Sequence, residues 1–288
     1  MNQLQEPEIW VDDGVNEPET LHLYETTRAA QGVQGFAAVD DAHVAQFLEQ
    51  GYLVIDDVFS PERVASALGG LLDLIGGRPA EFTGIQFEAN ARELLPTMPP
   101  ELRQDVVRKL MGFVQHEPRL DAVAADPDLL AILTRIMGEA PVLFQDQALL
   151  KPPLSGREKP WHQDNAFFSL PADSMIVGVW IALDEALPEN GCMHVIPGSQ
   201  RSGPVPHFQR RDWQICDTDV AVTQVLSVPL KPGGCLLFHG LLHHGTPPSR
   251  SPLRRRALQF HYKPASVART DDEERLAVFG SEGKDVTC

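Results

Sequence analysis

A histidine and an aspartate stand two residues apart in the stretch WHQDNAFF, residues 161–168. In an extended strand, side chains two residues apart point to the same face, so His162 and Asp164 would present an imidazole and a carboxylate side by side. Such a pair supplies two of the three ligands in the two-histidine, one-carboxylate arrangement that binds Fe(II) and leaves other positions open. By itself the pair is equally well explained by a solvated turn, because a chain with 10 histidines can show it by chance.

Candidates for the missing groups lie downstream, on two consecutive predicted strands. The turn signal Pro-Gly-Gly at 232–234 precedes a buried-strand pattern at 235–239 and a histidine-rich segment at 241–246. After a loop rich in Pro, Ser and Arg, residues 254–262 predict the next strand. A histidine that closes one strand and an arginine that opens its neighbour can face one cavity, where the arginine fork would bind a carboxylate. Of the three consecutive arginines, alternation lets the middle one, Arg255, point inward.

This combination of motifs resembles the phytanoyl-CoA dioxygenase family of Fe(II)- and 2-oxoglutarate-dependent oxygenases. Members of that family carry His-x-Asp, a distal histidine followed by Gly-Ser or Gly-Thr, and an arginine eleven residues after that histidine. Here the distal motif is His244-Gly245-Thr246, and Arg255 lies eleven residues beyond His244. Strand alternation turns the adjacent His243 to the opposite face.

Three further segments extend the resemblance to about residues 42–264. Trp180 lies in the apolar stretch 176–183, where the family has a tryptophan on the next core strand. Residues 189–200, ENGCMHVIPGSQ, resemble a family segment that ends in Pro-Gly-Ser-His, with Gln200 in the place of that histidine. Residues 47–55 match the family's opening helix-to-strand pattern.

The resemblance implies a ligand set and a cosubstrate site. Fe(II) would be bound by His162, Asp164 and His244, and 2-oxoglutarate by Arg255 and Thr246, with O2 as the oxidant. Two more residues are predicted at the cosubstrate site: Trp180 and Gln147. The predicted substrate residues are Asn165, Phe167, Phe168 and Lys151.

Several of these side chains also have a purely structural explanation. Large aromatic residues such as Trp180 are mostly buried in any fold, and Phe167 and Phe168 can simply pack. Gln147, in a predicted strand at 142–150, and Lys151, just after this strand, can belong to an exposed strand face. Four remaining histidines are assigned to the core or the surface: His194, His207, His239 and His261.

The overall composition favours a cytoplasmic protein that acts on a small molecule. The formal net charge of −16 argues against nucleic acid or an anionic membrane surface as a partner. Four scattered cysteines without a CxxC motif indicate reduced thiols. The acidic amino terminus lacks a signal-peptide pattern, and no apolar run reaches the roughly 18 residues that a membrane helix needs. A second copy of the chain, in a homodimer, is left open as a partner.

Helices are predicted mainly in the first half of the chain and strands in the second. Asp40-Asp41 and Ser60-Pro61 begin helices that run to about Gln50 and Ile75, with a strand at 52–56 between them. Further helices are predicted at 99–114, 127–137 and 271–278. Further strands are predicted at 142–150, 176–183, 220–229, 235–239 and 254–262, while residues 80–98 have no assignment.

Helices first and strands later indicate a mainly β core with flanking helices, an α+β arrangement. The resemblance implies a double-stranded β-helix, related to jelly rolls and cupins, with the metal in the open mouth of the barrel. We expect one oxygenase domain at 39–266, a partly ordered amino-terminal arm at 1–38 and a carboxy-terminal tail at 267–288.

The expected activity is hydroxylation of an unactivated C–H bond in a small metabolite or natural-product intermediate, with release of succinate and CO2. The carboxylate of Asp164 favours hydroxylation, because related halogenases have a small residue there, while desaturation and ring closure stay open. One alternative is a cupin-type metal enzyme, either an isomerase or a dioxygenase that does not use 2-oxoglutarate. Another is a catalytically silent family member that acts as a binding protein.

Overall fold

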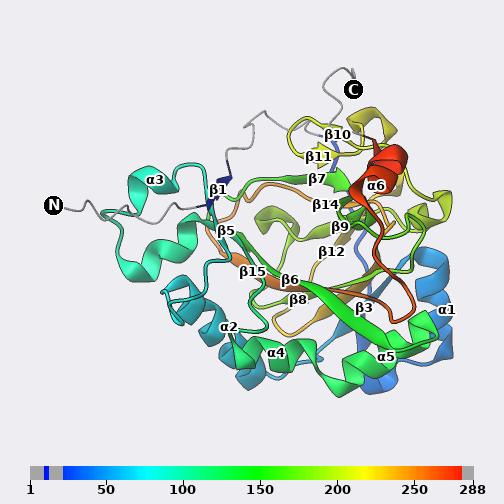
Figure 1. Cartoon of the computed structure of the whole chain (residues 1–288), viewed down its shortest axis with the longest axis horizontal. Coiled ribbons are helices and arrows are strands. Elements are labelled where there is room, and N and C mark those ends of the chain that lie inside the picture. Colours follow the sequence, from blue (N-terminus) through cyan, green and yellow to red (C-terminus); the bar gives the residue numbers. More distant parts are fainter. Residues whose placement is uncertain (1–9, 13–21, 281–288) are drawn as a thin grey trace.

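Two β-sheets face each other in this protein, and helices cover the outer face of the larger one (Figure 1). The computed structural model describes residues 10–12 and 22–280. Within these residues the larger sheet has nine strands and the smaller sheet has four. The predicted jelly-roll core with flanking helices is thereby confirmed.

The strands of each sheet come from distant parts of the chain. The larger sheet runs in the order β1 (Trp10–Asp12), β4 (Ile85–Glu88), β5 (Val107–Met111), β6 (Pro141–Lys151), β15 (Arg255–Pro264), β8 (Val177–Ala182), β13 (Cys235–His239), β3 (Tyr52–Asp56) and β2 (Val33–Gln34). The smaller sheet runs in the order β12 (Leu226–Val228), β9 (Met193–Val195), β14 (His244–Thr246) and β7 (Lys159–His162). A separate hairpin joins β10 (Phe208–Gln209) and β11 (Trp213–Gln214).

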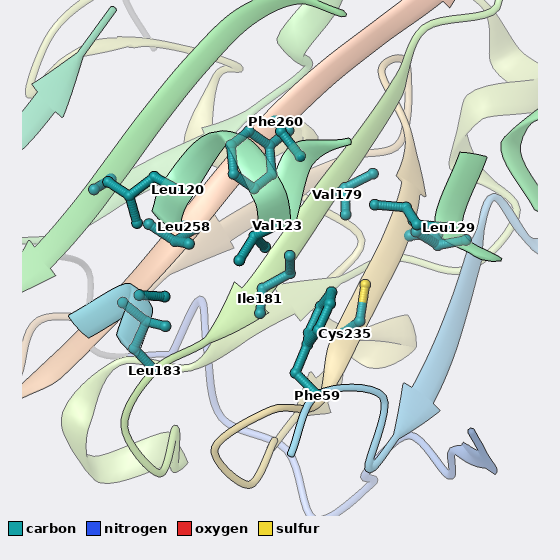
Figure 2. Packing of buried hydrophobic residues seen from close by; sticks show 14 of the residues in the cluster. Phe59, Leu120, Val123, Leu129, Val179, Ile181, Leu183, Cys235, Leu258 and Phe260 are labelled. Carbon is teal, nitrogen blue, oxygen red and sulfur yellow. The ribbon is translucent and has the colours of Figure 1, made fainter. Parts of the chain in front are cut away.

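Apolar side chains cover the outer face of the larger sheet and part of its inner face. Its outer face packs on α2 (Pro61–Ile75), α4 (Pro118–Ala124) and α5 (Pro127–Met137). Figure 2 shows this layer, in which Leu258 and Phe260 of the sheet lie beside Leu120 and Val123 of α4. The inner face packs on the smaller sheet through a second cluster. Burial on both sides holds the central strands rigidly, and these strands carry the site described below.

Three helices begin and end where the sequence predicts. Asp40 caps α1 (Asp41–Gln50) by accepting a hydrogen bond from the backbone N–H of His43, and Gly51 ends this helix with a φ of 79°. The Ser60 hydroxyl caps α2 in the same way, and α5 follows the predicted bounds. The remaining α-helices of the described residues are α3 (Ala91–Leu94) and α6 (Asp272–Phe279), and α6 lies where a helix is predicted.

One prediction of secondary structure is wrong, and another is correct only in part. The predicted helix at 99–114 is a 3-10 helix at Pro100–Val106 followed by strand β5. The β-branched pair Val106 and Val107 disfavours a helix, and β5 gains ladder hydrogen bonds from both β4 and β6. The predicted strand at 220–229 is extended only at Leu226–Val228, because two short 3-10 turns precede it.

Parts of the predicted arm and tail pack on the domain. Leu23 is buried in a cluster with Trp161, and Phe279 of α6 is buried with Leu241. Three ranges of the predicted arm and tail lie outside the described residues: 1–9, 13–21 and 281–288. In the part of the chain that the structure describes, no helix combines the length and the apolar character needed to cross a membrane.

Candidate metal and cosubstrate site

The side chains of His162, Asp164 and His244 come together between the sheets. His162 ends β7, Asp164 begins a 3-10 helix, η3 (Asp164–Phe167), and His244 begins β14. β14 pairs antiparallel with β7, so that His244 lies directly opposite His162. The Asp164 Oδ1 lies 3.3 Å from His162 Nε2 and 3.4 Å from His244 Nε2, and all three side chains are buried.

The predicted strand around this motif is shorter than expected. The strand ends at His162, but Gln163 keeps an extended backbone with φ −115° and ψ 131°. One extended residue between the histidine and the aspartate is enough to turn both side chains to one face, so their predicted proximity holds.

The hydrogen bonds of the two histidines leave room for a cation. His162 Nδ1 lies 2.7 Å from the Pro160 carbonyl oxygen, and His244 Nδ1 lies 2.9 Å from that of Leu242. A carbonyl oxygen only accepts hydrogen bonds, so both ring protons belong on Nδ1 and both Nε2 lone pairs face Asp164. Three electron-pair donors this close repel one another unless a cation lies among them. The donor set therefore fits a divalent metal such as Fe(II).

Burial and nearby charges keep two of these groups ready for metal binding. Burial, and then the neighbouring His244, lower the pKa of His162 to about 4. Burial alone would raise the pKa of Asp164, but His244 and His261 outweigh it and hold that pKa well below its usual range. At neutral pH the site therefore presents an Asp164 carboxylate and a neutral His162 imidazole, as metal coordination requires.

Arg255 opens β15 and is only 2% exposed. Its Nη1 donates to the Leu149 carbonyl oxygen at 3.0 Å, and its Cζ lies 5.5 Å from the centroid of the buried Trp180 ring. Its Nε is buried without a partner, and burial lowers the pKa of Arg255 to about 10. Among the described residues no carboxylate forms an ion pair with Arg255. A buried guanidinium group without a carboxylate partner favours binding of an anionic group beside it.

The two arginines beside Arg255 have the opposite orientation, as the alternation of the strand predicts. Arg254 forms a two-pronged ion pair with Asp105, at 2.6 and 2.7 Å. Arg256 pairs in the same way with Asp184, at 2.7 and 2.6 Å. Both are satisfied by carboxylates of the chain itself, which leaves Arg255 as the member of the triplet that faces the cavity.

The metal ligands and Arg255 line one cavity of about 430 Å³. Five of the other predicted residues also line it: Gln147, Thr246, Phe167, Phe168 and Lys151. Its wall contains further charged and amide side chains that were not predicted, among them Arg108, Lys109, Arg157, Lys159, Arg211 and Gln259. A cavity of this size, lined by both polar and apolar side chains, suits a small ligand with polar groups beside the cosubstrate.

Two predicted substrate residues make contacts that support the fold. Lys151 donates from its ammonium to two backbone carbonyls, one of them that of Pro247 at 2.8 Å. Asn165 lies outside the cavity wall, and its Nδ2 donates to the carbonyls of Ala172 and Ser174, each at 3.1 Å. Both side chains hold loops beside the cavity, and their contact with substrate stays a prediction.

The site also contains a histidine that the sequence analysis assigned to the core or the surface. His261 Nε2 lies 2.7 Å from Asp164 Oδ2, and Gln259 Nε2 lies 3.2 Å from the same oxygen. Both residues are on β15, at even steps from Arg255, so alternation places all three on one face. Strand alternation that starts from Arg255 predicts this position for His261. His261 therefore belongs to the site, unlike the other histidines assigned to the core or the surface.

Comparison with known proteins agrees with this site. The chain matches the family model described as Phytanoyl-CoA dioxygenase (PhyH) over residues 47–257. Phytanoyl-CoA dioxygenase domain-containing protein 1 of Danio rerio is 27% identical over 258 residues, which cover 77% of this chain and 89% of that protein. A probable alpha-ketoglutarate-dependent hypophosphite dioxygenase of Stutzerimonas stutzeri is 27% identical over 235 residues, covering 77% and 78%.

Solved structures resemble this fold as well. EctD from S. alaskensis, crystallised with 2-oxoglutarate and 5-hydroxyectoine, has a TM-score of 0.62 and 25% identity, covering 79% of this chain and 77% of EctD. The carbocyclase SnoK, at 20% identity and a TM-score of 0.64, covers 88% of this chain and 96% of SnoK, and shares the fold. Since the family match spans most of the chain and includes the three metal-ligand candidates and Arg255, this protein belongs to the phytanoyl-CoA dioxygenase family.

Proposed function

We propose that this protein is an Fe(II)- and 2-oxoglutarate-dependent dioxygenase that hydroxylates a C–H bond of a small molecule and releases succinate and CO2. The observation that carries the proposal is the shared cavity. Two histidines and a carboxylate converge at one point of its wall, and a buried arginine without a carboxylate partner lies at another. Those are the groups needed to hold a metal and a dicarboxylate side by side.

Each residue has a role that follows from its position. His162, Asp164 and His244 would hold iron from one side only, and iron bound there would supply the activation of O2 that oxidises both cosubstrate and substrate. Arg255 would bind the far carboxylate of 2-oxoglutarate with its fork, with the Thr246 hydroxyl beside it. The cavity walls would hold the reacting C–H bond in place.

The substrate in this proposal is a small polar metabolite or natural-product intermediate. The similar proteins include a probable hypophosphite dioxygenase and an ectoine dioxygenase, so family membership does not select the substrate. The cationic and amide side chains of the cavity wall favour a polar compound over a hydrocarbon. Hydroxylation is favoured over halogenation because Asp164 occupies the ligand position that a halide would need. A cytoplasmic location and a homodimer remain parts of the proposal.

Two other functions make different predictions from the same site. A cupin-type enzyme would use more imidazole ligands and would not need Arg255, whereas the cluster in the described residues holds two histidines and one carboxylate. A silent binding protein would have no use for a metal site and a buried arginine in one cavity.

Succinate formation tests the proposal directly. The purified protein is supplied with Fe(II), ascorbate and 2-oxoglutarate, and succinate is measured in air and without O2. We expect O2-dependent succinate at a slow basal rate, increased by the correct substrate in a screen of small polar compounds. Succinate at the level of a His244→Ala control would contradict the assignment, and full activity with a strong chelator present would exclude iron.

A further inference from the structure

The two oxygens of the Asp164 carboxylate lie in different surroundings. Oδ1 faces the Nε2 atoms of His162 and His244, which are the other candidate metal ligands. Oδ2 points the opposite way, toward His261 Nε2 at 2.7 Å and Gln259 Nε2 at 3.2 Å. One oxygen is thus free for a metal, while the other is engaged by side chains of β15.

The proton of His261 has one favourable place. The residue is 0% exposed, and its Nδ1 is buried with no partner. A proton on Nδ1 would be a buried donor without an acceptor, which costs more than a bare lone pair. The proton therefore belongs on Nε2, from where it is donated to Asp164 Oδ2. This tautomer is inferred from the hydrogen-bond geometry.

The rings around His261 hold it in this orientation. Phe168 lies 4.9 Å away between ring centroids, Phe144 6.1 Å and Phe238 6.4 Å. In this aromatic environment a phenylalanine would cost less free energy to bury than a histidine, because the Nδ1 of the histidine has no hydrogen-bond partner. With its proton on Nε2, the imidazole makes its hydrogen bond to Asp164 Oδ2, and the neighbouring Gln259 Nε2 donates to the same oxygen. The hydrogen-bonding capacity of the His261 imidazole is therefore used for the Asp164 carboxylate.

We propose that His261, assisted by Gln259, is a positioning residue that keeps Asp164 a one-oxygen metal ligand. With Oδ2 held by two donors, the carboxylate can offer only Oδ1 to the metal. A carboxylate free to bind through both oxygens would occupy a second position, one of those that the cosubstrate and O2 need. The inference rests on the proposed metal site, but it concerns the geometry of any first-row ion bound there.

The test uses Co(II) as a spectroscopic probe, under anaerobic conditions, in the whole 288-residue chain. The main variant is His261→Phe, which fills the aromatic environment and removes the donor. We expect Co(II) affinity to fall on the order of 10- to 100-fold, as is usual when a hydrogen bond to a metal ligand is lost. We also expect weaker visible absorption per bound Co(II), because this absorption declines as the coordination number rises. The absorption of the Fe(II) and 2-oxoglutarate complex should change as well.

Two variants separate positioning from packing. His261→Gln places an amide N–H near the position of Nε2 and should restore most of the affinity and the spectrum. His194→Phe alters another buried histidine, which hydrogen-bonds to the Cys192 carbonyl and does not contact Asp164, and it should bind Co(II) like the parent. A folded His261→Phe protein with parental affinity and spectrum would overturn the inference.

Two further outcomes keep the test decisive. If His261→Phe does not fold, Gln259→Met is used instead, because it removes the other donor to Oδ2. It should shift the Co(II) spectrum in the same direction by a smaller amount. A Gln259→Met protein with the parental spectrum would then contradict the inference. If the parent itself binds no Co(II), the proposed metal site fails. If the parent binds Co(II) and 2-oxoglutarate but the variants match it, only the role of His261 fails.

Discussion

Adjacent residues of the same type have different environments in this site. His244 is buried with its Nε2 toward Asp164, whereas the Nε2 of its neighbour His243 has no partner in the described structure. Arg255 faces the cavity, whereas Arg254 is paired with Asp105 at 2.6 Å. These contrasts provide matched pairs of variants that differ by one position in the sequence.

The first prediction compares the two histidines. His244→Ala should weaken Fe(II) binding by more than the roughly 10- to 100-fold that follows loss of an outer hydrogen bond, because it removes one of three ligands. His243→Ala should bind Fe(II) nearly like the parent. Metal content after dialysis and equilibrium titration measure both. If His243→Ala loses the metal and His244→Ala keeps it, the ligand assignment is wrong by one residue.

The second prediction concerns the cosubstrate. Arg255→Ala should raise the KM for 2-oxoglutarate on the order of 100-fold or more, because a buried carboxylate without its partner costs about 3–5 kcal/mol. Metal binding should survive. Arg255→Lys should recover part of the loss, since an ammonium does not reproduce the two-pronged contact.

Arg254→Ala is the control for this prediction, because that side chain is satisfied by Asp105 on the other face of the strand. It should leave the KM for 2-oxoglutarate almost unchanged. 2-Oxoglutarate is titrated into the Fe(II) protein under anaerobic conditions. The absorption of the chelate then measures 2-oxoglutarate binding without turnover. Equal effects of Arg254→Ala and Arg255→Ala would contradict the orientation of β15.

At the scale of elements, β15 positions most of the site. It is paired on one side with β6 and on the other with β8, and its alternate side chains Arg255, Gln259 and His261 face the space between the sheets. The intervening residues Leu258 and Phe260 pack on the helices instead. A slip of one residue in this register would exchange the two sets, so the apolar packing of the outer face also determines the chemistry of the inner face.

The third prediction concerns the element that follows the metal motif. Asn165→Ala in η3 should lower the free energy of unfolding, because the Ala172 and Ser174 carbonyls each lose a donor at a cost of about 1–3 kcal/mol. Urea unfolding of the metal-free protein measures this. Phe167→Leu, in the cavity wall and 36% exposed, is the comparison and should change substrate turnover more than stability. Unchanged stability with a raised substrate KM for Asn165→Ala would favour the predicted substrate contact.

At the scale of the whole molecule, buried histidines couple folding to pH. Burial lowers the pKa of His162, His194, His239 and His243 to about 4 and that of His207 to about 3, from an ordinary 6.5. Between these values and 6.5 the unfolded chain binds protons that the folded chain does not. Folding stability must therefore rise with pH across this window and fall on acidification.

The fourth prediction follows from this rise of folding stability with pH. The metal-free protein should be most stable above about pH 6.5 and should lose stability toward pH 4, by up to about 1.4 kcal/mol per pH unit for each such histidine. Urea unfolding at several pH values, with a chelator present, measures the slope. His239→Gln removes one of these groups and should reduce it. A stability that does not change across the window would contradict neutral burial of these histidines.

The residue pattern by itself determined the groups that meet in the cavity. Within one strand the direction of a side chain depends on local backbone geometry, so the pairing of His162 with Asp164 and the inward position of Arg255 could be predicted from spacing. Caps and left-handed glycines are local as well, and for this reason the bounds of α1, α2 and α5 agree with prediction.

Which distant residues complete the site depends on how the strands and sheets pack against one another. The strand character of β5 depends on partners far along the chain, and ladder hydrogen bonds outweigh its helix-like spacing. The contact of His261 with Asp164 joins residues 97 apart in sequence. A buried polar group is recognised as functional by the partner it faces, and that partner is set by how the two sheets pack.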